Sequence, residues 1–244
     1  MSGGERADLF LVAHGFAASR AEAQAAIRAG NVSANGKPVT KAAQNLQSDM
    51  KIEYAPSHPY VSRGGVKLDA ALTYFGYSPS GLVCLDVGAS TGGFTQVLLE
   101  RGAARVYAID VGHGQLVRKI AANPNVVAIE GLNARDLSRV HVQEAVAAIV
   151  VDVSFISLKL VLPAAFALAA PGAWAVLLVK PQFETGREAI GKGGIVKTDS
   201  ARQGAVDDIS AFVEKHGWRA EASMPSPITG GDGNQEFLLA AQRR

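Results

Sequence analysis

Short apolar runs rich in β-branched residues recur through most of the chain, separated by segments with helical spacing. The five clearest runs lie at residues 82–85, 105–109, 126–129, 147–151 and 174–179. Between them, apolar residues return every three or four positions, which is typical of helices that bury one face. This alternation of strands and helices favours an α/β fold with a doubly wound sheet. Residues 218–224 and 236–240 predict two further strands near the end of the chain.

A different pattern precedes the first of these runs. Ser19 is expected to cap a short helix, with Glu22 three residues later as its partner in a capping box. Asn35 and Gly36 lie between two short strand-like segments and predict a β-hairpin. Residues 51–54 predict a last strand. The sequence therefore indicates a small α+β unit ahead of the α/β unit.

A proline-containing stretch separates the two units. Pro56 and Pro59 favour a short, semi-rigid connection. We therefore expect a small domain over residues 1–56, a linker over residues 57–62 and the larger domain over residues 63–244.

A glycine-rich turn follows the first apolar run of the larger domain. Such a turn brings backbone N–H groups and a helix N-terminus against a ligand at the carboxyl edge of a parallel sheet. Ser90 stands where a dinucleotide fingerprint needs its second glycine, and no P-loop lysine follows the last glycine. Asp86, before the turn, suits a ligand with an ammonium group, such as the methionine end of S-adenosylmethionine. The residues expected to hold this cofactor at the turn are Asp86, Gly88, Ala89, Ser90, Gly92, Gly93 and Phe94.

Polar residues also follow the later strands. Asp110 ends the second strand and is expected to accept hydrogen bonds from ribose hydroxyls, while Asn133 follows the third and is expected to read an adenine edge. Asp152 ends the fourth strand and Lys180 the fifth. A charge after an apolar strand is costly unless it is exposed in a cleft or paired, so these residues and Asp86 predict a ligand cleft at one sheet edge.

Composition limits the classes of protein that remain. The net charge of +2 is too small to indicate nucleic-acid binding by itself. Cys84, the one cysteine, excludes an intramolecular disulfide and a cysteine-rich metal site, and it fits a reducing cytoplasm. The five histidines show no metal-ligand spacing, so no metal is expected. No signal peptide is recognised at the start of the sequence.

One apolar segment is long enough to be compared with a membrane span. Residues 160–179 carry no charge, and a spanning helix needs about 20 such residues. Pro163, Pro171 and Gly172 interrupt the segment. We therefore interpret it as two core elements, a helix ending near Ala170 and a strand over residues 174–179, joined by a Pro171-Gly172 turn. No stable membrane insertion is expected.

The small domain contains a long string that matches a known RNA-binding family. Residues 15–37, GFAASRAEAQAAIRAGNVSANGK, resemble the domain named after small-subunit ribosomal protein S4. The resemblance implies docking on structured RNA, most often ribosomal RNA. Arg20, Arg28, Lys37 and Lys41 are the candidate phosphate contacts, although acids are nearly as numerous here and a solvated helix face remains the alternative.

Four charged residues of the larger domain, with their local contexts, match a second family. Lys67, Asp152, Lys180 and Glu236 resemble the Lys-Asp-Lys-Glu tetrad of the FtsJ-like ribose 2′-O-methyltransferases. Together with the RNA-binding segment, nearly the whole chain resembles the TlyA family of ribosomal RNA cytidine 2′-O-methyltransferases, also labelled hemolysins. The resemblance implies a Rossmann-like class I methyltransferase sheet, mostly parallel with an antiparallel last strand. It also implies S-adenosylmethionine as cofactor and ribosomal RNA as partner, with Arg63 and Lys192 as further RNA contacts.

The tetrad makes chemical sense for a ribose hydroxyl. A 2′-hydroxyl is a poor nucleophile until it is deprotonated and held in line with the methyl group, and Lys180 is the best candidate for that task. Cytosine C5 methylation needs a nucleophilic cysteine, but Cys84 lies inside the first apolar run and is expected in the core. Base-amine methylation usually follows an Asn/Asp-Pro-Pro-aromatic turn, and residues 152–155 lack the two prolines. A membrane-active hemolysin and a non-catalytic RNA-binding protein remain alternatives.

Overall fold

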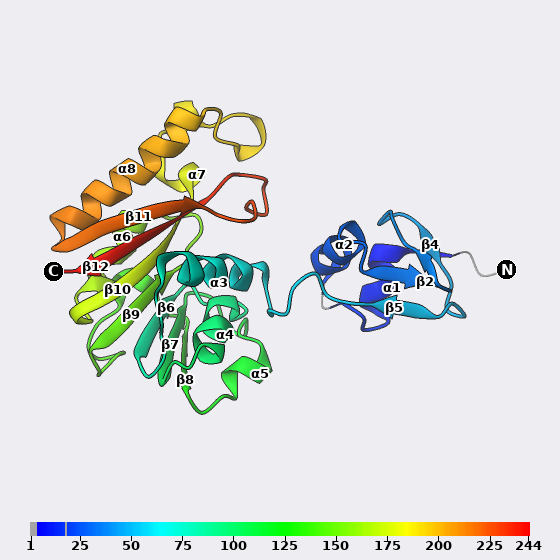
Figure 1. Cartoon of the computed structure of the whole chain (residues 1–244), viewed down its shortest axis with the longest axis horizontal. Coiled ribbons are helices and arrows are strands. Elements are labelled where there is room, and N and C mark those ends of the chain that lie inside the picture. The colour runs from blue at the N-terminus through cyan, green and yellow to red at the C-terminus, as the bar shows by residue number, and fades with distance from the viewer. Residues whose placement is uncertain (1–3, 18) are drawn as a thin grey trace. The chain divides into compact units, whose positions relative to one another are not determined.

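The computed structural model describes residues 4–17 and 19–244 and divides the chain into two compact units (Figure 1). The first unit is Met1–Pro59 and the second is Tyr60–Arg244, and each has its own hydrophobic core. Residues 1–3, part of the predicted small domain, and residue 18, inside the matched RNA-binding string, lie outside the described residues.

The N-terminal unit is an α+β fold, as predicted. Its elements are α1 (Ala7–Ala13), α2 (Arg20–Arg28), β1 (Glu5–Arg6), β2 (Val32–Ala34), β3 (Lys37–Pro38), β4 (Asn45–Leu46) and β5 (Ile52–Tyr54). β2 lies between β3 and β5 in an antiparallel sheet, and β1 pairs with β4. The hydroxyl of Ser19 accepts a hydrogen bond from the backbone N–H of Glu22, which confirms the predicted N-cap of α2. Asn35 and Gly36 both adopt positive φ, as the tight hairpin turn requires.

A buried carboxylate joins α1 to the rest of this unit. Asp8 is fully buried and accepts hydrogen bonds from the side chains of Arg6, Arg20 and Gln24. Its hydrogen bond with Arg6 is the main reason that the pKa of Asp8 lies well below its usual range. Arg20 therefore links α2 to α1 through its hydrogen bond to Asp8.

The second unit is built on one seven-stranded sheet with the order β11-β12-β10-β9-β6-β7-β8. Its strands are β6 (Val83–Val87), β7 (Arg105–Asp110), β8 (Val126–Glu130), β9 (Val146–Val151), β10 (Ala169–Val179), β11 (Trp218–Pro225) and β12 (Phe237–Arg243). The ladders from β8 through β10 are parallel, and β12 runs antiparallel to both β10 and β11. This confirms the mostly parallel sheet with an antiparallel last strand.

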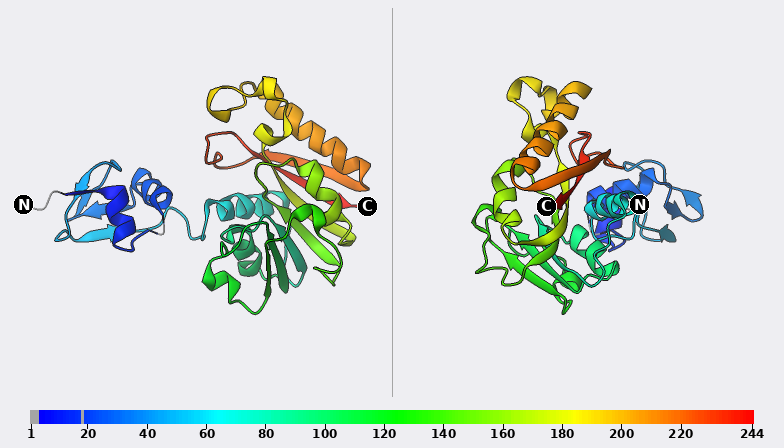
Figure 2. Two further views of the ribbon diagram at one scale, coloured as in Figure 1. Left: turned by 180° about the vertical axis from the view of Figure 1, so that it is seen from behind. Right: turned by 60° about the vertical axis from the view of Figure 1, so that its left-hand side comes forward.

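Helices cover both faces of this sheet (Figure 1 and Figure 2). The helical elements are α3 (Arg63–Phe75), α4 (Gly93–Glu100), α5 (Arg118–Ala121), η1 (Ala134–Asp136), α6 (Leu158–Phe166), α7 (Pro181–Glu184), η2 (Arg187–Ala189), η3 (Lys192–Gly194) and α8 (Asp199–Lys215). Side-chain alternation along β6 assigns the faces: Cys84 packs in the cluster with α3 and α4, and Leu85 in the cluster with α6 and α8. The core therefore has two layers, one on each side of the sheet.

The uncharged segment at residues 160–179 differs in detail from the prediction. It does contain a helix and a strand, but α6 ends at Phe166 and β10 begins at Ala169. Pro171 and Gly172 lie inside β10, where the pairing with β9 shifts register, rather than in a turn between two elements. Gly172 absorbs the irregularity with φ +73°. Across the described ranges 4–17 and 19–244, no helix combines the length and the apolar character that crossing a membrane requires.

Candidate active site

The sheet brings three of the four tetrad residues to one edge. β10 and β12 pair with Val179 opposite Phe237, so Lys180 and Glu236 leave the sheet on neighbouring strands. Asp152 directly follows β9, the strand on the other side of β10. Adjacent strands lie about 4.8 Å apart, so side chains at these three positions meet easily. The segments are far apart in sequence, and the topology alone places them together.

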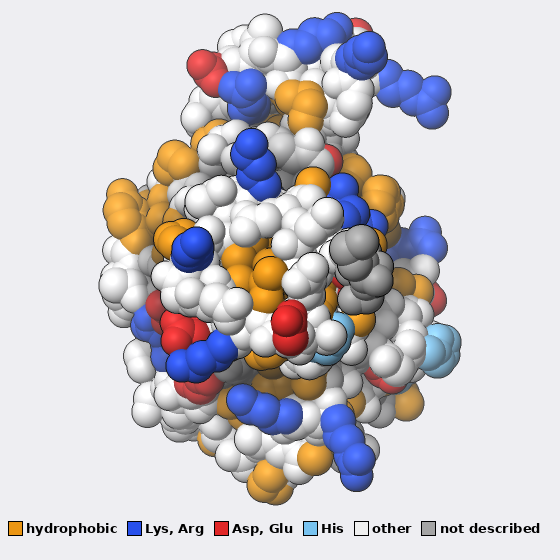
Figure 3. Space-filling view, turned by 90° about the vertical axis from the view of Figure 1, so that its right-hand side faces the viewer, with side chains coloured by type: hydrophobic (Ala, Val, Ile, Leu, Met, Phe, Trp, Pro, Cys, Tyr) orange, Lys and Arg blue, Asp and Glu red, His pale blue; other side chains and the backbone are white. Residues whose placement is uncertain are grey.

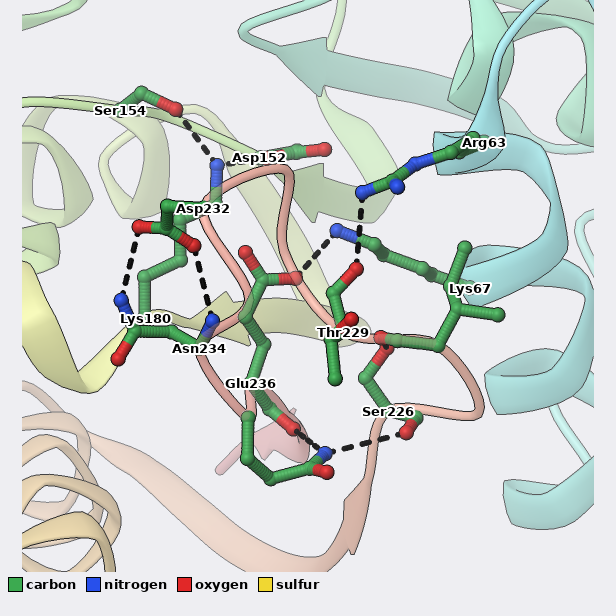
Figure 4. Close-up of polar contacts among 12 residues, drawn as sticks. Arg63, Lys67, Asp152, Ser154, Lys180, Ser226, Thr229, Asp232, Asn234 and Glu236 are labelled. Atoms are coloured by element: carbon green, nitrogen blue, oxygen red, sulfur yellow. Dashed lines mark hydrogen bonds and ion pairs between the residues drawn. The ribbon is translucent and has the colours of Figure 1, made fainter. Parts of the chain in front are cut away.

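The tetrad forms two ion pairs (Figure 4). Lys67 pairs with Glu236, and only 7% and 3% of their side chains are exposed. The ammonium of Lys180 lies 2.6 Å from Oδ1 of Asp152 and donates a hydrogen bond of 2.8 Å to Oγ of Ser154. Burying a charge is costly unless it has a partner, and the three most buried members of the tetrad, Lys67, Lys180 and Glu236, each have one.

The fourth residue, Lys67, comes from a helix that packs on the sheet. Leu68, Ala71 and Leu72 of α3 are buried in the cluster on that face, which fixes the helix. Lys67 is the fifth residue of α3 and points its ammonium at Glu236. At the start of the helix, the guanidinium of Arg63 donates to the carbonyl of Thr229 at 2.9 Å, in the loop that leads to β12.

The loop before β12 is held by a buried amide. Asn234 is 1% exposed, and its Oδ1 accepts from the backbone N–H of Val196 at 2.9 Å. Its Nδ2 donates to the carbonyl of Gly194 at 3.0 Å and to Asp232 at 2.9 Å. Asp232 also accepts from Gln182 at 3.1 Å. Asn234 thus ties the glycine-rich loop of residues 186–197 to the segment that carries Glu236.

A cavity opens beside the tetrad at the carboxyl edge of the sheet. It has a volume of about 480 Å³, within the usual range for cofactor sites. A smaller hollow of about 110 Å³ adjoins it, and both are lined by Gly88, Ser90 and Asp152. Asp110 and Asn133 line the larger cavity, and Ala89, Gly93 and Phe94 line the smaller one. The glycine turn, Asp110 and Asp152 therefore line neighbouring hollows, whereas Lys67, Lys180 and Glu236 line neither of them.

Two predicted cofactor residues are held rigidly in the larger cavity. Asp110 accepts hydrogen bonds of 2.7 Å from the backbone N–H groups of Ser90 and Gly112, one at each carboxylate oxygen. Asn133 accepts a hydrogen bond from the N–H of Arg135 and so caps η1. These backbone contacts fix both side chains without occupying all of their hydrogen-bonding capacity.

Asp86 lies elsewhere than the sequence suggested. It does not end its strand but lies within β6, fully buried, and it lines neither cavity. The hydroxyl of Thr95 donates to its carboxylate at 2.6 Å. Burial raises the pKa of Asp86 to about 7. The strand continues to Val87, two residues past the apolar run that ends at Leu85, and the acid faces α4. Gly92, also predicted at the cofactor, closes the turn against Leu116 with φ +98° and lines neither cavity.

The predicted RNA contacts are distributed over both units. Arg28, Lys37 and Lys41 are exposed on the N-terminal unit, and Arg63 and Lys192 are exposed on the second. Figure 3 shows lysine and arginine side chains interspersed with acidic ones on the face in view, as the balance of 24 basic and 22 acidic residues implies. Their role in RNA binding stays a prediction.

One conspicuous residue was not singled out from the sequence. Phe155 is 91% exposed, lines the larger cavity and adopts φ +63°. Its ring lies 5.3 Å from that of Phe183. A non-glycine residue in this backbone region and an exposed aromatic ring are both uncommon, and together they mark functional positions. Its place three residues after Asp152 was the only signal in the sequence.

This sheet, with a glycine turn that lines a cavity and two lysine–acid pairs at the same edge, defines an α/β methyltransferase of class I. The chain belongs to the FtsJ-like methyltransferase family, whose model matches residues 60–243, in the group with TlyA and hemolysin A. The S4 domain model matches residues 5–52.

Relatives cover almost the whole chain. Hemolysin A of Brachyspira hyodysenteriae is 40% identical over 96% of this chain and 98% of that protein. The 16S/23S rRNA (cytidine-2′-O)-methyltransferase TlyA of Mycobacterium tuberculosis is 42% identical over 96% of this chain and 88% of that protein. A solved structure of a putative hemolysin from Streptococcus thermophilus has 38% identity and a TM-score of 0.79, covering 100% of this chain and 90% of that one.

Proposed function

We propose that this protein transfers a methyl group from S-adenosylmethionine to the ribose 2′-oxygen of a cytidine in ribosomal RNA. The observation that carries the proposal is the set of two Lys–acid contacts, the buried Lys67–Glu236 and the part-buried Lys180–Asp152, of which Asp152 lines the cavity of the glycine turn. The fold and family support methyl transfer. The S4 domain and the names of the relatives support ribosomal RNA as the substrate.

The residues around the cavity fit the proposed cofactor. The fixed carboxylate of Asp110 suits the two hydroxyls of a ribose, and the amide of Asn133 suits an adenine edge. The smaller hollow, between the glycine turn and the start of α3, has room for the methionine end. S-adenosylmethionine supplies an electrophilic methyl group on a sulfonium centre. Neither Asp86 nor Gly92 lines the cavity, so both are assigned an indirect role in holding the turn.

The tetrad then acts on the substrate hydroxyl. Lys180 first releases one proton to water and then takes the proton of the 2′-hydroxyl onto Nζ, and the carboxylate of Asp152 stabilises the ammonium before and after this exchange. Lys67 and Glu236 border Lys180 from the β12 side and hold that part of the site rigid. Preorganised charges of this kind need no rearrangement during the reaction. Positioning of the hydroxyl supplies a large part of the rate.

Phe155 offers a surface for the target base. A base whose ribose is to react must leave its stack, and an exposed aromatic ring beside the cavity can receive it. Binding energy for the remaining RNA is assigned to the S4 domain, with Arg28, Lys37 and Lys41 as phosphate contacts.

Radiolabelled methyl transfer to isolated ribosomal subunits tests the proposal. The subunits come from a bacterium that lacks a methyltransferase of this family, and the product is digested and mapped by mass spectrometry. We expect 2′-O-methylcytidine with the wild-type protein and none with Lys180→Ala, while both bind the RNA equally. Label in a base, or full activity of Lys180→Ala, contradicts the proposal. Dye release from liposomes by the same preparation, with no methyl transfer, would favour membrane activity instead.

A further inference from the structure

Lys180 has a second partner besides its acid. Its Nζ lies 2.6 Å from Asp152 and donates to the hydroxyl of Ser154 at 2.8 Å. We propose that Ser154 is a positioning residue that orients Lys180 toward the 2′-hydroxyl of the substrate. The inference rests on the proposed function, because it assigns Ser154 a role in the same proton transfer.

The geometry of an amine explains why two partners matter. Once Lys180 has released a proton, its nitrogen has two N–H bonds and one lone pair, arranged tetrahedrally. If one N–H points to Asp152 and the other to Ser154, the lone pair has a fixed direction and is the group left for the incoming hydroxyl. With Asp152 alone, the nitrogen rotates about a single contact and the lone pair samples many directions. Two acceptors therefore convert a flexible amine into an oriented base.

The second acceptor is also suitable because it is uncharged. A further carboxylate beside Lys180 would add a second negative charge next to the substrate oxygen, which itself becomes negative as its proton leaves. The hydroxyl of Ser154 accepts a hydrogen bond without adding a negative charge. It therefore directs the nitrogen without placing a second negative charge beside the substrate hydroxyl.

The backbone after β9 delivers this hydroxyl to Lys180. β9 ends at Val151, and the chain then turns sharply, with Phe155 at φ +63°. Ser154 is exposed and lines the same cavity as Asp152 and Phe155. An exposed serine is not needed for core packing, so its contact with a nearly buried lysine has another purpose. The turn places the ring of Phe155 and the hydroxyl of Ser154 beside the same substrate nucleotide.

Three variants of the full-length protein test this role. Ser154→Ala removes the acceptor, Ser154→Thr keeps it, and Ser210→Ala is a matched control whose hydroxyl donates to Val206 within α8. Each is assayed for kcat and KM with ribosomal subunits, for the Kd of S-adenosylhomocysteine by calorimetry, and for its melting temperature. We expect Ser154→Ala to lose about tenfold to a hundredfold in kcat, the size of effect that misplacement of a reacting group produces. KM and Kd should change less than about twofold, and Ser154→Thr should regain most of the kcat.

The outcomes separate this inference from the proposed function. If the wild type is active and Lys180→Ala is inactive, a Ser154→Ala variant with normal kcat overturns the positioning role alone. A weaker Kd for S-adenosylhomocysteine in Ser154→Ala, with kcat unchanged, would make Ser154 a cofactor contact and also overturn it. If Ser154→Ala melts at a lower temperature, Ser154→Val is compared with Ser154→Thr, which has the same shape but keeps the acceptor, and equal activity of the two refutes the role. A wild-type protein that methylates no ribosomal RNA removes both proposals.

Discussion

Lys67 and Glu236, which are 169 positions apart in the sequence, form a buried ion pair at the edge of the sheet. Removing one partner leaves a buried charge without compensation, which typically costs about 3–5 kcal/mol. We therefore expect Lys67→Ala to lower the free energy of unfolding by about that amount. Chemical denaturation followed by circular dichroism measures the loss.

A double substitution separates stability from activity at the same pair. Replacing both charges, as in Lys67→Met with Glu236→Leu, removes the uncompensated acid and should restore most of the stability, because apolar pairs can replace buried ion pairs at little cost. Methyl transfer should stay lost in both variants. A double variant as unstable as Lys67→Ala would show that the two charges do not compensate each other.

Asp86 predicts a specific dependence of stability on pH. Its pKa is raised by burial to about 7, whereas an unfolded aspartate titrates near 3.9. The folded state therefore binds this proton more tightly, so the stabilisation is complete below about pH 4 and is lost as the pH rises through about 7. We expect the melting temperature of Asp86→Asn, relative to the wild type, to rise between pH 5 and 7 and to level off above pH 8. Parallel melting curves at all pH values would show that Asp86 keeps an ordinary pKa.

Gly88 is a position where a methyl group should abolish the cofactor site. It has φ +87°, and an added Cβ would meet the carbonyl oxygen of Asp152 at 2.2 Å. Gly88→Ala should displace the turn or Asp152 and weaken binding of S-adenosylhomocysteine at least tenfold, as measured by calorimetry. Gly81→Ala is the control, because Gly81 has φ +72° with no atom within 4 Å of an added Cβ. Equal binding losses in the two variants would assign the effect to backbone strain alone.

Asn234 predicts a change in the mobility of a loop. Its side chain holds Gly194 and Val196, so Asn234→Ala should release the loop of residues 186–197. Trypsin cleavage at the exposed Arg187 and Lys192 should then be at least several-fold faster, and kcat should fall because Glu236 lies two residues from the lost anchor. Gln203→Ala, which removes an amide bound to Asp207 on α8, is the matched control. Unchanged proteolysis would mean that other contacts hold the loop.

Periodicity and turn chemistry predicted most of the elements of this fold. The strand at residues 126–129 and the Asn35-Gly36 hairpin were found because local pattern and tertiary environment agree there. The β1–β4 pair was missed because strands of two residues show no alternation. The boundary between α6 and β10 was placed wrongly because a continuous apolar run has no period, and only the register with β9 decides it.

Some residues of the candidate site could likewise be predicted from local sequence patterns, and others could not. The strand-end residues Asp110, Asp152 and Lys180 could be located because the carboxyl ends of parallel strands converge. The pairing of Lys67 with Glu236 needed the antiparallel insertion of β12, which no local pattern encodes. Phe155 was missed because neither its exposure nor its backbone angle is visible in the sequence.

The position of β12 between β10 and β11 has a consequence for biosynthesis. A nascent chain that ends before Glu236 contains the whole glycine turn and the other three tetrad residues. Lys67 then lacks the acid with which it pairs in the complete fold. The Lys67–Glu236 ion pair therefore forms only when β12 closes the sheet between β10 and β11. A chain that ends before Glu236 would therefore retain the glycine turn of the proposed cofactor site but lack the Lys67–Glu236 pair.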